Sequence, residues 1–529
     1  MGSATGYGGR TLSMNSRAHP WMERLREGLT IGILSTPFLI TGLATLQVGF
    51  LSNEHAHLIE KALLIRDRGR VEWIGFAYPP LPALMLLIHP SPTTATILAS
   101  LLGGLLAWSV WKRLEILPFP AWIRAGLLLS AVATPTSLFL ATQRLGMICA
   151  LLLFFWSWRL YLAFTRHGRT DAAFLSALLI GFSFYASFYA PAFAIAFALS
   201  TPLFTRLHGI RHTTAILLVM LFPTTLSIGA WMYLAWLFTG APLGFLYEPG
   251  SSLLAALRPE EAFLSPAPMG REILERLIST PLYIGTGLLI ARRQPRRLPA
   301  YLIPLALNLI AWNLGWAFPR ELSLSLWILF ALSGIPARTP RRWGLPLLLL
   351  ALLQIPTGLL TTHRGEMRRW WAAVFEKQPP EMEKVEKEIA LYLKSQTCGS
   401  VLTDDRHAYR IIAMAGTACP FILPPDPIFD LAVSQPARFV AYVLVPDTEN
   451  GFPTPLETRY RQRPPTGFRL EITWPGWKLY RKVSPEGLRP PETLQAQLGK
   501  AQRYPISRDE SRNNRRVAPT TDGSKGPAG

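Results

Sequence analysis

Cysteine is scarce in this sequence, with 3 among 529 residues. Three cysteines exclude a disulfide-rich framework, and their spacing fits no zinc-binding motif. Cys149 lies in an apolar run, where we expect it to fill space as a small apolar side chain. Cys398 and Cys419 lie in a more polar region and are able to pair if that region is extracytoplasmic. The sequence leaves this pairing open.

Charged residues are also few, and acids are fewer than bases. Charged residues make up 16% of the chain and apolar residues 50%, with a mean hydropathy of +0.24, which excludes an ordinary soluble enzyme. The net charge of +20 by itself would suit a nucleic acid. However, the basic residues fall mostly in short connections between apolar runs, which is the pattern of cytoplasmic loops in membrane proteins. We therefore expect a partner in the lipid bilayer and no nucleic acid.

About eleven apolar runs are the expected membrane spans, and many of them have the roughly 17–22 residues needed to cross a hydrocarbon core. They lie near 29–50, 92–111, 121–141, 145–163, 172–186, 188–204, 213–239, 279–291, 298–317, 322–337 and 344–361. The first run is longer than a signal-peptide core and precedes no small-residue cleavage site, so we expect it to remain as an anchor. Basic connections after alternate runs place the tail 1–28 in the cytoplasm, and the odd number of runs then places the C-terminus outside.

The rest of the organisation follows from composition. Residues 29–362 form the expected membrane domain, whose two long outer connections are 51–91 and 240–278. Residues 363–485 are expected to form a small extracytoplasmic α/β domain, and the Pro-, Gly- and Arg-rich tail 486–529 is predicted to be disordered. In that domain a helix is predicted at 381–394 and strands near 400–402, 411–414, 439–445 and 468–474. The predicted fold class is a polytopic α-helical membrane protein with about eleven spans and a C-terminal α/β domain.

The first outer connection carries the strongest chemical signal. Glu54, His55 and His57 lie where the first apolar run ends, and polar groups at membrane depth are costly unless they have a use. A carboxylate shielded from water has a raised pKa and suits a general base; the alternative is that Glu54 only caps the following helix. Two histidines two residues apart do not share a helix face, so a metal site is not favoured, although a divalent metal is left open.

Several further residues are candidates for contacts with a phosphate or another part of a substrate. They are His55, His57, Arg66, Arg68, Tyr78, Arg144, Arg258 and Arg320. Each of these residues could instead have a purely structural role. Arg144 could reach from an apolar helix to the membrane interface, and Arg320 could form a local ion pair with Glu321. The prolines after Tyr78 are ordinary at the start of a helix.

Taken together, these features resemble the GT-C superfamily. The resemblance rests on Asn53-Glu54 after the first span, the amphipathic segment 54–68 and the entry Tyr78-Pro79-Pro80-Leu81. It is closest to the family-39-like branch of protein O-mannosyltransferases, aminoarabinose transferases and lipopolysaccharide glycosyltransferases. In the family an acidic pair in this loop supplies the catalytic carboxylate, and only its second member, Glu54, is matched here.

The resemblance implies an inverting glycosyltransferase of the plasma membrane. It would move a sugar from a polyprenyl-phosphate donor to a hydroxyl group of a glycan, lipid or protein on the extracytoplasmic side, in the biosynthesis of cell-envelope glycans. Because Asn53 replaces the first acid, a second hypothesis is a non-catalytic subunit with the same fold. A polyprenyl-glycan polymerase or transporter is a third reading, which the lack of an internal repeat weakens.

Overall fold

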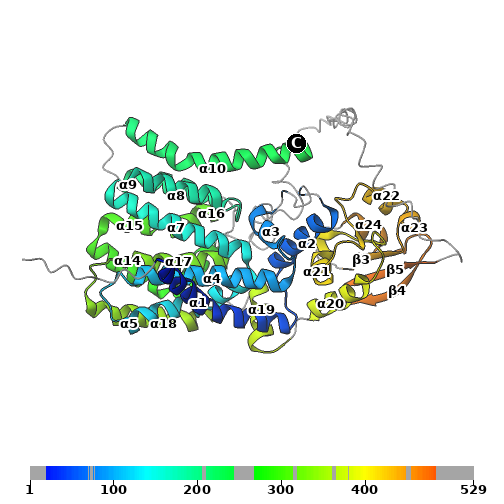
Figure 1. Cartoon of the computed structure of the whole chain (residues 1–529), viewed down its shortest axis with the longest axis horizontal. Coiled ribbons are helices and arrows are strands. Elements are labelled where there is room, and N and C mark those ends of the chain that lie inside the picture. The colour runs from blue at the N-terminus through cyan, green and yellow to red at the C-terminus, as the bar shows by residue number, and fades with distance from the viewer. Residues whose placement is uncertain are drawn as a thin grey trace, which may run out of the picture. The chain divides into compact units, whose positions relative to one another are not determined.

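The computed structural model describes residues 20–69, 71, 76, 78–204, 210–243, 267–313, 319–359, 365–378, 381–447 and 454–483. Residues Met1–Arg481 form one compact unit and Lys482–Gly529 a second. Arg258 and most of the predicted connection 240–278 lie outside the described residues. The description below concerns the first unit, shown in Figure 1.

The N-terminal two thirds of the described chain is helical. Its helices are α1 (Pro20–Gln47), α2 (Asn53–Arg68), α3 (Pro80–Leu86), α4 (Pro92–Leu114), α5 (Ala121–Val132), α6 (Pro135–Gln143), α7 (Leu145–His167), α8 (Thr170–Ser183), α9 (Ala190–Phe204), α10 (Ile210–Thr239), α13 (Ala267–Ser279), α14 (Pro281–Arg293), η2 (Pro295–Arg297), α15 (Leu298–Tyr301), α16 (Ile303–Asn313), α17 (Arg320–Gly334), η3 (Arg341–Trp343) and α18 (Gly344–Leu359). Every apolar run predicted from the sequence overlaps one of these helices or a bent pair of them. The mostly helical architecture is therefore confirmed.

Within the described residues, five helices are long and apolar enough to cross a membrane: Trp21–Gln47, Pro92–Leu114, Leu145–Thr165, Thr214–Thr239 and Arg341–Leu359. Two bent pairs, α5 with α6 at 63° and Ile273–Ser279 with α14 at 87°, raise this number to seven. The helices α8 and α9 are apolar but shorter. The count of about eleven spans stays a prediction, because only these five to seven helices or bent pairs among the described residues are long and apolar enough to cross.

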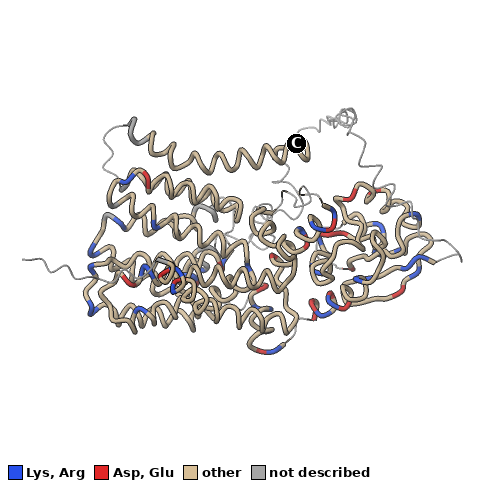
Figure 2. Tube along the Cα trace, in the orientation of Figure 1, with Lys and Arg blue, Asp and Glu red and all other residues tan. Residues whose placement is uncertain are grey.

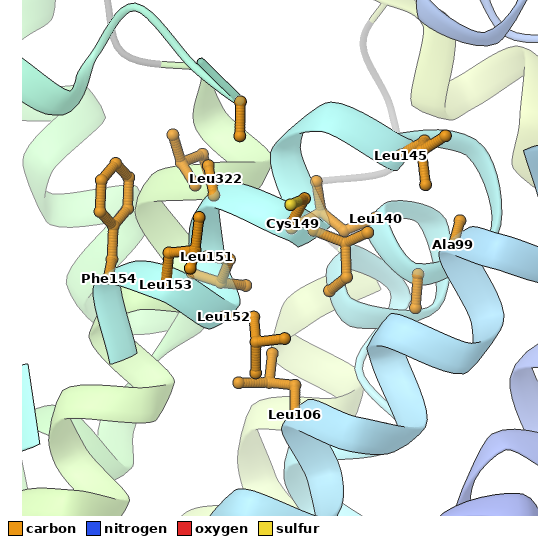
Figure 3. Close-up of a cluster of buried hydrophobic side chains, with 14 of the residues drawn as sticks. Ala99, Leu106, Leu140, Leu145, Cys149, Leu151, Leu152, Leu153, Phe154 and Leu322 are labelled. Atoms are coloured by element: carbon orange, nitrogen blue, oxygen red, sulfur yellow. The ribbon is translucent and has the colours of Figure 1, made fainter. Parts of the chain in front are cut away.

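Small residues let the membrane helices approach closely. A Cβ atom on Gly104 of α4 would lie 2.9 Å from the carbonyl oxygen of Ile31 on α1, so only glycine allows these backbones to pack at that distance. Cys149 is buried on α7 among leucines, as Figure 3 shows, which confirms its predicted role as an apolar filler. Figure 2 shows Lys and Arg gathered at the ends of the apolar helices.

The described part of the first connection contains two helices, α2 and α3. Ser52 caps α2 by accepting a hydrogen bond from the His55 N–H, and Gly69, at φ 69°, ends the helix in the left-handed conformation that glycine tolerates best. Leu58, Ala62 and Ile65, which share one apolar face of this helix, are buried. Pro80 begins α3, where its missing N–H has no helical partner to lose. The amphipathic helix predicted at 54–68 is thus confirmed.

The C-terminal described residues form an α/β region. Its elements are α19 (Gly365–Phe375), α20 (Glu381–Lys394), β1 (Val401–Leu402), α21 (Asp405–Ala415), β2 (Phe421–Ile422), α22 (Phe429–Ser434), α23 (Pro436–Phe439), β3 (Tyr442–Pro446), α24 (Pro455–Tyr460), β4 (Phe468–Trp474) and β5 (Trp477–Lys482). The sheet has the order β2-β1-β3-β5-β4, with β1 parallel to β2 and β3, and β5 antiparallel to β3. A disulfide joins Cys398 to Cys419, just before β1 and β2, so the pairing that the sequence left open is formed. The boundary of this region as a separate domain stays a prediction.

The strand predicted at 411–414 is wrong, because these residues lie in α21. Asp404 caps this helix by accepting a hydrogen bond from the Arg406 N–H, and Ala408, Ile411 and Ala415 are buried at three- and four-residue spacing. A run of four apolar residues cannot distinguish a strand from the buried face of a helix. The predicted helix at 381–394 is confirmed with the same bounds, as α20.

Candidate active site

Glu54 lies in the first turn of α2 and points at the beginning of another helix. Its Oε1 atom accepts hydrogen bonds from the N–H groups of Gly146 at 2.7 Å and Met147 at 3.4 Å. These are among the first N–H groups of α7, which have no partner inside their own helix and attract negative charge. The Glu54 side chain is 14% exposed, and its Oε2 atom is 3.6 Å from Nη1 of Arg144. The structure therefore places a nearly buried carboxylate between a helix N-terminus and an arginine.

The surroundings of Glu54 act on its pKa in opposite directions. Burial raises the pKa of this carboxyl above the ordinary value, and the neighbouring Glu366 raises it further. Arg144 and the two backbone N–H groups of α7 oppose this shift. The balance is a raised pKa, which makes the ionised carboxylate a better proton acceptor than an exposed glutamate.

Glu366 is a second acid of the site, and the sequence did not predict it. Its Oε2 atom is 2.6 Å from Nη2 of Arg144, and its Oε1 atom accepts a hydrogen bond from the Asn53 N–H. Glu366 belongs to α19, whose sequence GEMRRWWAAVF combines charges with tryptophans, as helices at a membrane surface do. That composition was the available signal. The contact itself joins residues hundreds of positions apart, which local patterns do not report.

Arg144 is the cation at the centre of this group. Besides Glu54 and Glu366, Glu321 at the start of α17 interacts with it electrostatically. Its guanidinium also lies 5.3 Å from the ring centroid of Phe139. Of the arginines predicted to contact substrate, the structure brings this one to Glu54. A merely lipid-extended arginine would not be surrounded by acids in this way.

His55 is a buried neighbour of Glu54 that links two helices. Its Nε2 atom accepts a hydrogen bond from the Leu145 N–H at 3.2 Å, so it satisfies a further free N–H group at the start of α7. Burial, together with the nearby Arg144 charge, lowers the pKa of His55 to about 3. Ser52 adds a bond from its hydroxyl to the Gln143 carbonyl oxygen. The neutral imidazole thus fixes α2 against α7, and a substrate contact for His55 stays a prediction.

His57 lies on α2 one turn after Glu54, and its ring stacks with two tyrosine rings. Its ring centroid is 4.9 Å from that of Tyr78 and 3.7 Å from that of Tyr409 on α21. Burial lowers the pKa of His57, and the charges of Lys61 and Arg410 lower it further. The structure therefore brings the predicted residues His57 and Tyr78 together, one turn away from Glu54.

Arg66 and Arg68 lie at the opposite end of α2, about 20 Å along the helix from Glu54 by the rise per residue. Arg66 donates to the Gly416 carbonyl oxygen at 2.9 Å and also contacts Asp67. Arg68 donates to the Phe421 carbonyl oxygen at 2.7 Å and is paired with Asp426 at 3.2 Å. These bonds attach α2 to the α/β region, and the structure does not bring the two arginines to Glu54.

The two remaining predicted arginines are placed differently. Arg320 at the start of α17 is paired with Glu275 of α13 at 2.9 Å, so it forms an ion pair between helices. Arg258 lies outside the described residues, and its role stays a prediction. Among the residues that the structure describes, no group of three His, Cys, Asp or Glu side chains is arranged to hold a metal ion.

Comparison with known proteins identifies the fold. No protein-family model matches this sequence, and no curated protein matches it either. The crystal structure of ArnT from Cupriavidus metallidurans bound to undecaprenyl phosphate is similar to this chain, with a TM-score of 0.56 and 12% sequence identity. The similarity covers 86% of this chain and 98% of that one. ArnT is an aminoarabinose transferase of the GT-C family.

The chain therefore has a fold similar to that of ArnT. At 12% identity the likeness concerns the fold, and it confirms the resemblance predicted from Asn53-Glu54 and the Tyr78-Pro79-Pro80-Leu81 segment. Independently, the long apolar helices support a membrane location. Chemistry has to be inferred from the site itself, because one fold can serve different functions.

Proposed function

We propose that this protein is an inverting glycosyltransferase that moves a sugar from a polyprenyl-phosphate donor to a hydroxyl acceptor on the extracytoplasmic side of the membrane. The observation that carries the proposal is the placement of the Glu54 carboxylate, which is nearly buried, has a raised pKa and lies 3.6 Å from Arg144. When a hydroxyl group displaces a phosphate leaving group, a proton acceptor takes the hydroxyl proton and a cation stabilises the charge of the phosphate.

In the proposed reaction, Glu54 takes the proton of the acceptor hydroxyl while its oxygen attacks the anomeric carbon of the donor sugar. The bond from that carbon to the phosphate oxygen breaks, and polyprenyl phosphate leaves with the bonding electrons. Arg144 supports the negative charge of the departing phosphate through charge-assisted hydrogen bonds. One displacement inverts the configuration of the anomeric carbon, as a single attack on a glycosidic centre does.

A small apolar cavity is lined in part by α6 and α7, the two helices that flank Arg144 in the chain. It has a volume of about 40 Å³ and lies between α1, α4, α5, α6, α7 and α17. Leu140 and Ile148, each four residues from Arg144 along the chain, line its wall. An apolar lining of this kind suits a hydrocarbon group, which favours a lipid-linked donor. The bound undecaprenyl phosphate of the similar ArnT structure supports the same donor class.

The test uses the full chain in lipid nanodiscs with a panel of undecaprenyl-phosphate-linked sugars and membrane glycolipids as acceptors. Release of undecaprenyl phosphate is measured. We expect Glu54→Gln to lower turnover by roughly 10²–10⁴-fold, the usual contribution of a general base, with unchanged yield of folded protein. Full turnover by this variant would refute the assignment of Glu54.

A non-catalytic subunit is the second candidate function. It is favoured by Asn53 in place of an acid and by the pairing of Arg144 with both Glu54 and Glu366, which leaves less positive charge for a phosphate. Under this alternative, the nanodisc preparation would bind undecaprenyl phosphate but would turn over no member of the donor panel.

A further inference from the structure

One helix of the α/β region, α21, lies along the helix that carries Glu54. Several contacts join them: the Asp405 carboxylate is 3.1 Å from Nζ of Lys61, the Tyr409 ring stacks on His57 at 3.7 Å, and Arg410 donates from Nη2 to Oδ1 of Asn53. The residue numbers of the partners increase along α21 while those of their partners decrease along α2, so the two helices run antiparallel. The α2 partners are spaced four residues apart, which places them on one face of that helix.

Asn53, the residue directly before Glu54, is held from several directions. Its Oδ1 atom accepts a second hydrogen bond from the Tyr409 hydroxyl at 3.2 Å, and its N–H donates to Glu366. The Arg410 side chain is 6% exposed, and its Nη1 atom lies 3.3 and 3.2 Å from the two carboxylate oxygens of Glu386 on α20. Because both side chains of this ion pair are buried, Glu386 holds the Arg410 guanidinium in a fixed position.

These bonds close a ring around the candidate base. Glu366 accepts from the Asn53 N–H and also binds Arg144, and Arg144 faces Glu54 from the other side. A displacement of the first turn of α2 would therefore move the Glu54 carboxylate away from the N-terminus of α7. Misplacement of a catalytic group by about 1 Å is able to cost 10²-fold in rate.

We propose that Arg410 is a positioning residue for Glu54: through Asn53 it fixes the first turn of α2 and with it the direction of the carboxylate. The inference rests on the proposed glycosyltransferase function. It assigns the α/β region a part in catalysis, because the arginine that orients the base comes from α21. Arg410 acts through Asn53 and need not touch substrate.

The chemistry of Asn53 suits this role. An amide oxygen has two lone pairs, and both are used, by Arg410 and by Tyr409. A carboxylate at this position would offer the same acceptor but would add a negative charge next to Glu54 and Glu366. Because Glu386 already neutralises the buried guanidinium, a neutral acceptor is sufficient here.

The experiment compares Arg410→Gln, Arg410→Lys, Asn53→Ala and the double variant Arg410→Gln/Asn53→Ala in nanodiscs. Turnover is measured with whichever undecaprenyl-phosphate sugar the wild-type chain uses, and hydrogen exchange is followed over residues 51–58. We expect Arg410→Gln to lower kcat at least tenfold with KM within twofold, and to accelerate exchange in this segment. The double variant should lose no more than the stronger single variant, and Arg410→Lys should recover part of the loss.

Arg461→Gln is the matched control, because Arg461 pairs with Asp447 and Glu457 inside the α/β region and should leave kcat and exchange unchanged. Wild-type kcat in Arg410→Gln, or additive losses in the double variant, would overturn the inference while leaving the proposed function intact. If the wild-type chain uses no donor, the proposed function fails, and unchanged exchange over 51–58 would then separately overturn the positioning role. Asn53→Ala tests the same bond from its other end if Arg410→Gln does not fold.

Discussion

At the scale of single residues, the candidate base depends on a neighbour from outside its own helix, Arg144, which lies 3.6 Å from Glu54. The sequence placed an acid after the first span, and the structure keeps that acid nearly buried beside Arg144. Arg144 was a separate candidate for the same phosphate, but no local pattern relates two residues in different helices. Glu366 was missed for the same reason. Chemical type can be read from the sequence, whereas pairing depends on how the chain folds back on itself.

The raised pKa of Glu54 sets the expected pH dependence. A general base must be ionised, so turnover should rise with pH through the pKa of Glu54, and burial moves this rise above the range of an ordinary glutamate. Asn53→Asp adds a second carboxylate beside Glu54 and should move the rise to still higher pH. The measurement is kcat/KM against pH for the two proteins.

Asn53→Ala is the control for this prediction. It removes the acceptor of Arg410 without adding a charge, so it should lower the rate at every pH and leave the midpoint in place. His55 should not contribute to the profile between pH 5 and 8, because burial lowers its pKa to about 3. A profile for Asn53→Asp that coincides with the wild-type profile would contradict the assignment of Glu54 as the titrating base.

At the scale of elements, long patterns predicted helices and strands more reliably than short ones. The amphipathic segment 54–68 and the helix 381–394 have the period of a helix over many residues, and both are helices. The four residues 411–414 carried no period, and the predicted strand is part of α21. The two-residue strands differ in outcome: β1 lies within the predicted strand near 400–402, whereas β2 was not predicted.

The junction of α2 and α7 has a glycine where the helices meet. A Cβ atom on Gly146 would lie 3.1 Å from Oε1 of Glu54 and 3.2 Å from the carbonyl oxygen of Ala186. The carboxylate would have to move by a few tenths of an ångström, which lengthens its 2.7 Å bond to the Gly146 N–H. We expect Gly146→Ala to lower kcat by roughly tenfold, since catalysis depends on placement at this scale.

Gly229→Ala is the control for the junction. Gly229 lies in α10, where an added Cβ would meet nothing within 4 Å, and alanine is the better helix former. Its kcat should equal that of the wild-type chain, and its melting temperature should be no lower. Equal kcat values for Gly146→Ala and Gly229→Ala would show that the contact between Glu54 and α7 does not limit the reaction.

At the scale of the whole molecule, the distribution of charge and the disulfide lead to one expected orientation. Basic residues gather at the ends of the apolar helices (Figure 2), and such clusters stay in the cytoplasm. Cys398 and Cys419 form a disulfide, which persists only in an oxidising compartment. The α/β region, to which α2 is attached through Arg68 and Asp426, should therefore face outward together with Glu54.

This orientation is tested by fusing alkaline phosphatase, which is active only outside the cytoplasm, after residue 483 and before residue 20. Activity is expected from the first fusion and not from the second, and a fluorescent protein that matures in the cytoplasm should give the reverse result. Because α2 and α21 are bonded to each other, Glu54 and the disulfide must lie on the same side of the membrane. A phosphatase signal from the N-terminal fusion alone would place the candidate base in the cytoplasm, where a polyprenyl-phosphate sugar presented on the outer leaflet could not reach it.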